Sequence, residues 1–169
     1  MYKRQHVDIR PIADTSREDR VWGRYRLFAD QDQHDEFDNK VVEIAHGDWQ
    51  NWCYKRFVVC KELMHTFDGI SARVSGQEGF DLLADEIEAD QEPETRPRQR
   101  SPQLQSEIDA QWKALLLVVP VVQRNEIAKA HPPIDPDYIA KTYRIPRVLV
   151  RALLSQDYED AAEDFLNSK

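Results

Sequence analysis

The residues of this chain best suited to chemistry lie in the segment Lys61-Glu62-Leu63-Met64-His65. Positions four residues apart lie on the same face of an α-helix, so the side chains of Lys61 and His65 should point to one side. Two histidines at these positions can bind a single Zn²⁺, while the intervening Glu polarises a metal-bound water molecule. Here the first position holds lysine, whose ammonium has no lone pair and binds a metal only after losing its proton, which costs several kcal/mol at neutral pH. The segment therefore has the spacing of a zinc-binding helix but lacks one ligand.

The residues around this segment resemble the zinc helix of the ImmA/IrrE-like metallopeptidases. Members of that family carry an Arg-Phe pair a few residues before a His-Glu-x-x-His motif, and Arg56-Phe57 stand in that place here. A second segment, Glu107-x-x-Ala110-Gln111-x-x-Ala114, is similar to the family's second site helix, which begins with a Glu ligand and has Asn where this chain has Gln111. A third, from 138 to 153, is similar to a short helix-turn-helix-like pair at the end of the family's domain. The three matches follow the family's order along the chain.

The resemblance implies a role for each matching site residue. If a metal is retained, His65 and Glu107 would be its ligands, and if the protein is active, Glu62 would be the catalytic base. Catalytic zinc usually has three protein ligands and a water molecule, so two ligands are too few. A further ligand would have to come from Cys60, His46 or His131.

A different hypothesis needs no metal. Lys61 could replace the positive charge of zinc and form an ion pair with Glu107 or Glu62 inside the cleft. Cys60 lies about 100° round the helix from Lys61 and should point elsewhere. On this hypothesis we expect no cofactor and an inactive enzyme, whereas zinc belongs to the peptidase hypothesis.

The elements that must position these residues follow from hydrophobic periodicity. Short alternating or β-branched runs within the first fifty residues predict an antiparallel sheet, and a period of three to four residues predicts helices at about 49–67 and 104–119. Taken with the resemblance, which implies a zincin-like single domain, these patterns give an expected fold class of α+β. In it a small antiparallel sheet, in the N-terminal third, packs on the active-site helix and further C-terminal helices. We assign 1–155 to this domain, with a flexible, proline-rich loop at 88–103, and 156–169 to an acidic C-terminal helix or tail.

A basic face is expected near the C-terminus, formed by Lys141, Arg144, Arg147 and Arg151. It could contact phosphate, although structural support is the simpler interpretation, with the acidic tail docking on it. The formal net charge of -8 argues against a surface that binds nucleic acid or anionic membranes as a whole. No run approaches the roughly 18 apolar residues of a membrane helix, so we expect no membrane partner and a cytoplasmic location, where Cys53 and Cys60 would stay reduced.

Members of the resembled family are commonly partners of helix-turn-helix repressors. By that resemblance, the first hypothesis is a catalytically degenerate metallopeptidase-like protein that binds a protein partner, either a transcriptional repressor or another regulatory protein of a phage or mobile element. The alternative is an active zinc endopeptidase with an atypical metal site that cleaves such a repressor. A weaker alternative is a DNA-binding accessory protein that acts through the basic face.

Overall fold

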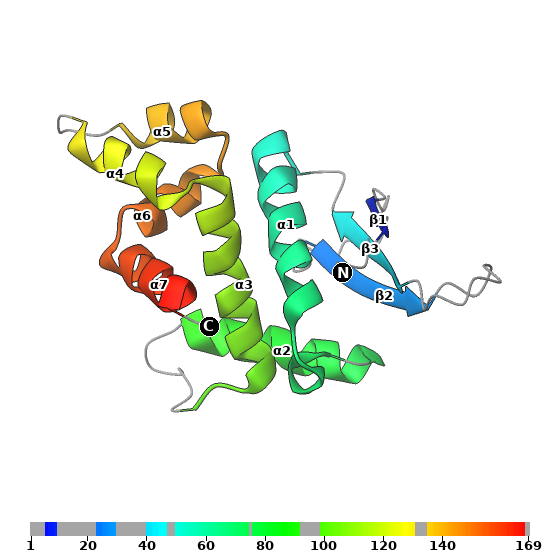
Figure 1. Ribbon diagram of the computed structural model, residues 1–169. Helices are drawn as coiled ribbons and strands as arrows, with labels where there is room; N and C mark the ends of the chain where they lie inside the picture. Colours follow the sequence, from blue (N-terminus) through cyan, green and yellow to red (C-terminus); the bar gives the residue numbers. More distant parts are fainter. Residues whose placement is uncertain are drawn as a thin grey trace.

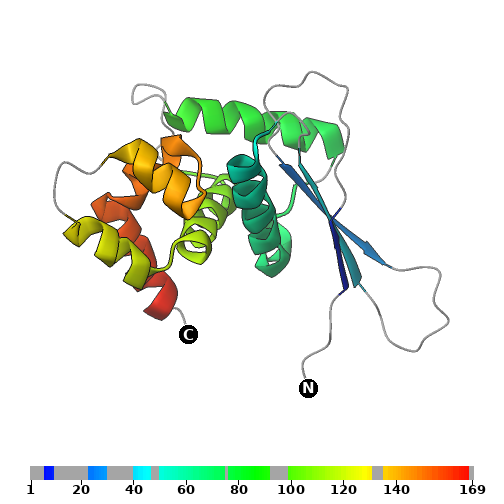
Figure 2. The same cartoon turned by 90° about the horizontal axis from the view of Figure 1, so that it is seen from above.

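A computed structural model describes residues 6–9, 23–29, 40–46, 50–74, 76–91, 99–130 and 135–167. Two long helices, α1 (Trp52–Met64) and α3 (Pro102–Val118), lie side by side in the middle of the molecule (Figure 1). A small sheet lies on the far side of α1 from α3, and the C-terminal helices lie on the far side of α3 (Figure 2).

The sheet has three short strands, β1 (His6–Ile9), β2 (Gly23–Ala29) and β3 (Lys40–His46), in the order β1-β3-β2. β2 pairs antiparallel with β3, but β1 pairs with β3 in parallel, with His6 opposite Val41 and Ile9 opposite Ile44. The expected α+β class with a small antiparallel sheet is therefore wrong. The protein is mainly helical, every described element after β3 is a helix, and the sheet is mixed. Alternation of apolar and polar residues marks extended segments but does not encode the direction in which they pair.

The helical part begins with α1, whose N-cap Asn51 accepts a hydrogen bond from the Tyr54 backbone N–H at 3.1 Å. The α3 helix begins in the same way, because Ser101 accepts from the Leu104 N–H and Pro102 occupies the first turn. The remaining helical elements are η1 (His65–Phe67), η2 (Ile70–Ala72), α2 (Gly76–Gln91), α4 (Val121–Lys129), α5 (Pro136–Tyr143), η3 (Arg147–Leu149), α6 (Val150–Leu153) and α7 (Gln156–Asn167).

The main core lies where α1, α3 and the C-terminal helices meet. Phe57 of α1 and Ala114 of α3 are buried in it together with Ile139 of α5 and Leu153 of α6. Tyr158 of α7 is fully buried, and its hydroxyl donates to the Val119 carbonyl at 2.6 Å. The segment expected to be an acidic helix or tail is thus a helix whose inner face belongs to the same core.

Two further expectations concern the rest of the chain. The loop expected at 88–103 overlaps the end of α2 and the start of α3, and its middle, 92–98, lies outside the described residues. Within the described ranges, no helix combines the length and the apolar character needed to span a bilayer.

Candidate functional site: a buried ion-pair cluster between α1 and α3

The packing of α1 against α3 brings together residues that are far apart in the sequence. Lys61 and Glu62 lie in the last turn of α1, and His65 begins the 3-10 turn η1 that continues from it. Glu107 lies in the second turn of α3, on the face toward α1. Lys61 and Glu107 form an ion pair here, as the hypothesis of a metal-free cleft expects.

Lys61 lies between two carboxylates. Its Nζ is 2.5 Å from Glu107 Oε2 and 3.3 Å from Glu62 Oε1, and the side chains of Lys61 and Glu107 are only 15% and 17% exposed. Burial by itself lowers the pKa of Lys61, but the charges of Glu62 and Glu107 outweigh it and raise that pKa above its ordinary value. Burial likewise raises the pKa of Glu107, yet His65 and Lys61 outweigh it and lower the pKa to about 2. Both partners therefore carry their charges at neutral pH.

His65 faces a carboxylate at each ring nitrogen. Its Nδ1 is 2.7 Å from Asp68 Oδ2, and its Nε2 is 3.1 Å from Glu107 Oε1. The second contact has the distance of an ion pair without the angle of a hydrogen bond. Burial lowers the pKa of His65, but the carboxylate of Glu107 outweighs that effect and raises the pKa above its ordinary value. The arrangement favours an imidazolium, which has no lone pair to offer a metal.

Two residues that the sequence pattern did not indicate fix the position of His65. Asp68 accepts a hydrogen bond from the hydroxyl of Ser106 at 2.5 Å, and the same hydroxyl lies 3.3 Å from His65 Nδ1. Asp68 stands three residues after His65, a spacing that brings side chains together on a helical turn. Ser106 precedes Glu107 on α3, and only the fold brings it close to η1.

Glu62 is covered by the start of β2. The residue is 4% exposed, and a Cβ atom on Gly23 would overlap Val58 Cγ1 and lie 2.9 Å from Glu62 Oε1. Glycine at position 23 therefore allows the strand to approach α1 this closely. A general base must reach a water molecule and substrate, and Glu62 is instead enclosed between Lys61 and the sheet.

The cluster does not fit a zinc ion. Lys61 places a protonated amine where the resemblance implies the first ligand, and the two residues that it implies as remaining ligands, His65 and Glu107, are in contact with each other. Among the described residues, no group of three or more His, Cys, Asp or Glu is arranged to hold a metal. Cys60 packs against the core and burial raises its pKa, whereas His131 lies outside the described residues.

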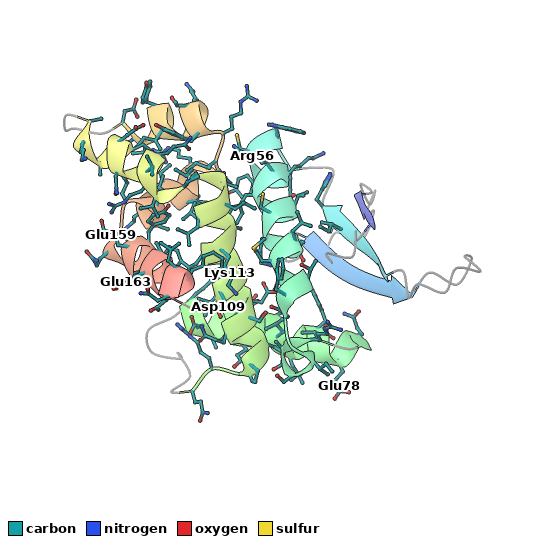
Figure 3. All side chains as sticks on the ribbon, viewed as in Figure 1. Arg56, Glu78, Asp109, Lys113, Glu159 and Glu163 are labelled. Carbon is teal, nitrogen blue, oxygen red and sulfur yellow. The ribbon has the colours of Figure 1, made fainter. Side chains whose placement is uncertain are left out.

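The Arg-Phe pair before the cluster has a structural role. Arg56 lies toward the start of α1 (Figure 3), and its guanidinium donates to the carbonyls of Tyr143 at 2.8 Å and Val118 at 3.4 Å. These carbonyls belong to the ends of α5 and α3, where helices lack internal donors. Phe57 is buried in the core. The pair thus anchors α1 to its neighbours at the end away from the cluster.

The basic face expected near the C-terminus lies outside this cluster. Lys141, Arg144, Arg147 and Arg151 are all exposed, on α5, η3, α6 and the turn between them. The acidic helix α7 has an ion pair elsewhere, between its Glu159 and Arg124 of α4. Figure 3 shows Glu159 on α7. Comparison of this chain with protein families, with curated proteins and with solved structures found no match.

Proposed function

We propose that this chain is a catalytically degenerate metallopeptidase-like protein that acts by binding a protein partner. The observation that carries the proposal is the position of Lys61 Nζ, which lies between Glu107 and Glu62 where the resemblance to ImmA/IrrE-like metallopeptidases places a metal. An ammonium there supplies positive charge to the two carboxylates, as a zinc ion would, without Lewis acidity or a bound water. The cluster is thus suited to holding α1 and α3 together rather than to hydrolysis.

The proposed class of partner is a helix-turn-helix repressor or another regulatory protein of a phage or mobile element. This part of the proposal comes from the resemblance. It is supported by two large apolar side chains on either side of Asp68, since Phe67 is 79% exposed and Ile70 is 86% exposed. Protein-binding surfaces commonly present large apolar side chains rimmed by polar groups.

Restoring the missing histidine tests the interpretation of the site. We expect wild-type protein, purified without a metal-affinity tag and desalted after zinc addition, to retain no zinc above background in elemental analysis. The Lys61→His variant should retain about one equivalent, because it completes a three-ligand set with His65 and Glu107. Two matched controls, Lys61→Gln and Lys61→His combined with His65→Ala, should retain none. Stoichiometric zinc in the wild type, lost in His65→Ala, would contradict the proposal and support the endopeptidase alternative.

Partner binding needs a second experiment. Proteins crosslinked to the wild-type chain in its own cells are identified, and the recovered partner is then purified and mixed with it. We expect a DNA-binding regulator that forms a complex of measurable Kd, keeps its intact mass, and binds equally well with EDTA or with the Glu62→Gln variant. Cleavage of the partner that EDTA or Glu62→Gln prevents would show an enzyme. Recovery only of partners that are neither repressors nor regulatory proteins of a phage or mobile element would reject the proposed class.

A further inference from the structure

A corner of the molecule remote from the ion-pair cluster carries concentrated positive charge. Between positions 138 and 156 the sequence contains four basic residues and no Asp or Glu, in a chain whose formal net charge is -8. All four basic side chains are exposed. We call this set the basic corner; it consists of Lys141, Arg144, Arg147 and Arg151.

The contacts and spacing place these side chains on one surface. Arg147 Nε lies 2.5 Å from Asp137 Oδ1, and Asp137 is one helical turn before Lys141 on α5. Arg151 follows Arg147 by four residues along η3 and α6, which are continuous. Arg144 ends α5 one turn after Lys141. Asp137 is the one acidic partner that a described contact gives to this group.

Arg144 has a backbone conformation that arginine disfavours. Its φ of 53° and ψ of 48° are left-handed, and it is the one non-glycine residue with positive φ among the described residues. Helices commonly end in this conformation with Gly or Asn, because other side chains are strained there. Arg144 donates its backbone N–H to the Ala140 carbonyl, which any residue except proline could do, so the turn itself does not require arginine. A strained residue that exposes a cation next to three others suggests a use for the charge.

We propose that the basic corner binds the phosphate backbone of nucleic acid. Phosphate groups are recognised by several separate cations on rigid elements, and this corner provides them on two short helices and the turn that joins them. Tyr138, which is 66% exposed and three residues before Lys141, adds an aromatic face on which a base can stack. Helix α6, from Val150 to Leu153, is too short to read a groove, so the binding is independent of sequence. This proposal is independent of the function proposed for the ion-pair cluster.

The test is fluorescence anisotropy with labelled 20-nucleotide single-stranded and duplex DNA of random sequence, titrated with full-length protein over a range of salt concentrations. We expect binding at low salt to at least one of the two probes, with log Kd rising against log salt with a slope of about 3, as about four phosphate contacts require. The Arg151→Gln variant should weaken binding several-fold and reduce that slope by about 1. Arg73→Gln, which removes an exposed cation at the α2 end of the molecule, should leave both unchanged.

Arg144→Gly separates binding from folding. Glycine relieves the left-handed strain, so the variant should melt at or above the wild-type temperature while it binds DNA several-fold more weakly. No binding of either probe by the wild type at low salt, or equal binding by Arg144→Gly and Arg151→Gln, would overturn the proposal. So would binding to vesicles of phosphatidylcholine and phosphatidylglycerol without binding to DNA.

Discussion

At Lys61 two opposing effects act on one amino group. Burial between α1 and α3 disfavours its charge, while Glu62 and Glu107 favour it, and the carboxylates prevail. A buried ion pair of this kind contributes little compared with a well-packed apolar pair, but removing one partner leaves an uncompensated charge. Lys61 therefore adds little net stability, but its removal would leave a buried carboxylate without a counter-charge.

We predict that Lys61→Ala lowers the free energy of unfolding by on the order of 3 kcal/mol, because Glu107 is left buried without its cation. Adding Glu107→Gln to this variant should recover part of the loss, since the amide needs no counter-charge. Urea unfolding of the single and double variants measures the coupling. Purely additive losses, or a Lys61→Ala effect within experimental error, would show that the pair has no energetic role.

The same cluster should make stability depend on pH. Because the pKa of Glu107 is lowered to about 2 in the folded protein, its contribution is complete above its ordinary pKa of 4.5 in the unfolded chain, and is lost as the pH falls from there toward 2. The pKa of His65 is raised, so its contribution is present below the unfolded value of 6.5 and is lost as the pH rises through the folded value. Thermal melts should show an acid limb between about pH 5 and pH 2 that Glu107→Gln flattens. If the acid limb is unchanged in Glu107→Gln, the loss of stability at low pH is due to other carboxylates.

At the scale of elements, the contact between β2 and α1 depends on glycine at position 23, which has no side chain. Gly23 lets the strand lie against Val58 and cover Glu62. We predict that Gly23→Ala destabilises the protein by roughly 1–3 kcal/mol, because the new methyl group overlaps Val58 and strand or helix must move. Gly69→Ala is a matched control, since a Cβ there meets only Ser71 Oγ at 4.0 Å. Chemical denaturation of both variants tests this, and equal stabilities would mean that β2 does not press on α1.

Local periodicity predicted the two central helices but not the pairing of the strands. The three-to-four residue spacing that predicts helices at about 49–67 and 104–119 depends only on neighbouring residues, and the observed helices, 52–64 and 102–118, end within three residues of those bounds. The relative direction of β1 and β3 depends on the path of the chain between them, and no local sequence pattern predicts that path. The parallel pairing was missed for this reason.

The candidate site was partly predictable for the same physical reason. The spacing of Lys61 and His65 predicts that they share a helical face, and the resemblance suggests that Glu107 lies opposite them. The contacts of Glu107 with both residues agree with that hypothesis. Gly23 comes to the site from β2, and Ser106 comes from α3, where it precedes Glu107; neither residue type marks a site in its own segment. Only tertiary packing gives them a role.

On the scale of the whole molecule, α7 joins the core although its sequence is strongly acidic. Its outer face carries the charges, and one of them, Glu159, pairs with Arg124, whose guanidinium also lies 5.8 Å from the centre of the Tyr158 ring. The inner face buries Tyr158 and Ala162 against α3 and α6. This division between an acidic exterior and an apolar interior explains why the acidic sequence of 156–169 left both a helix and a tail open.

Because α7 contributes buried side chains to the core, we predict that the chain cannot fold without this last helix. Removing 156–169 would uncover the core around Val119 and leave that carbonyl without the Tyr158 hydroxyl, so we expect loss of the cooperative thermal transition measured by circular dichroism. Tyr158→Ala should lower the free energy of unfolding by about 3–5 kcal/mol through the cavity it creates. Leu166→Ala, on the same helix but 73% exposed, should change it by less than about 0.5 kcal/mol. A truncated chain that still melts cooperatively near the wild-type temperature would mean that the core is complete before α7, and that this helix is an appendage after all.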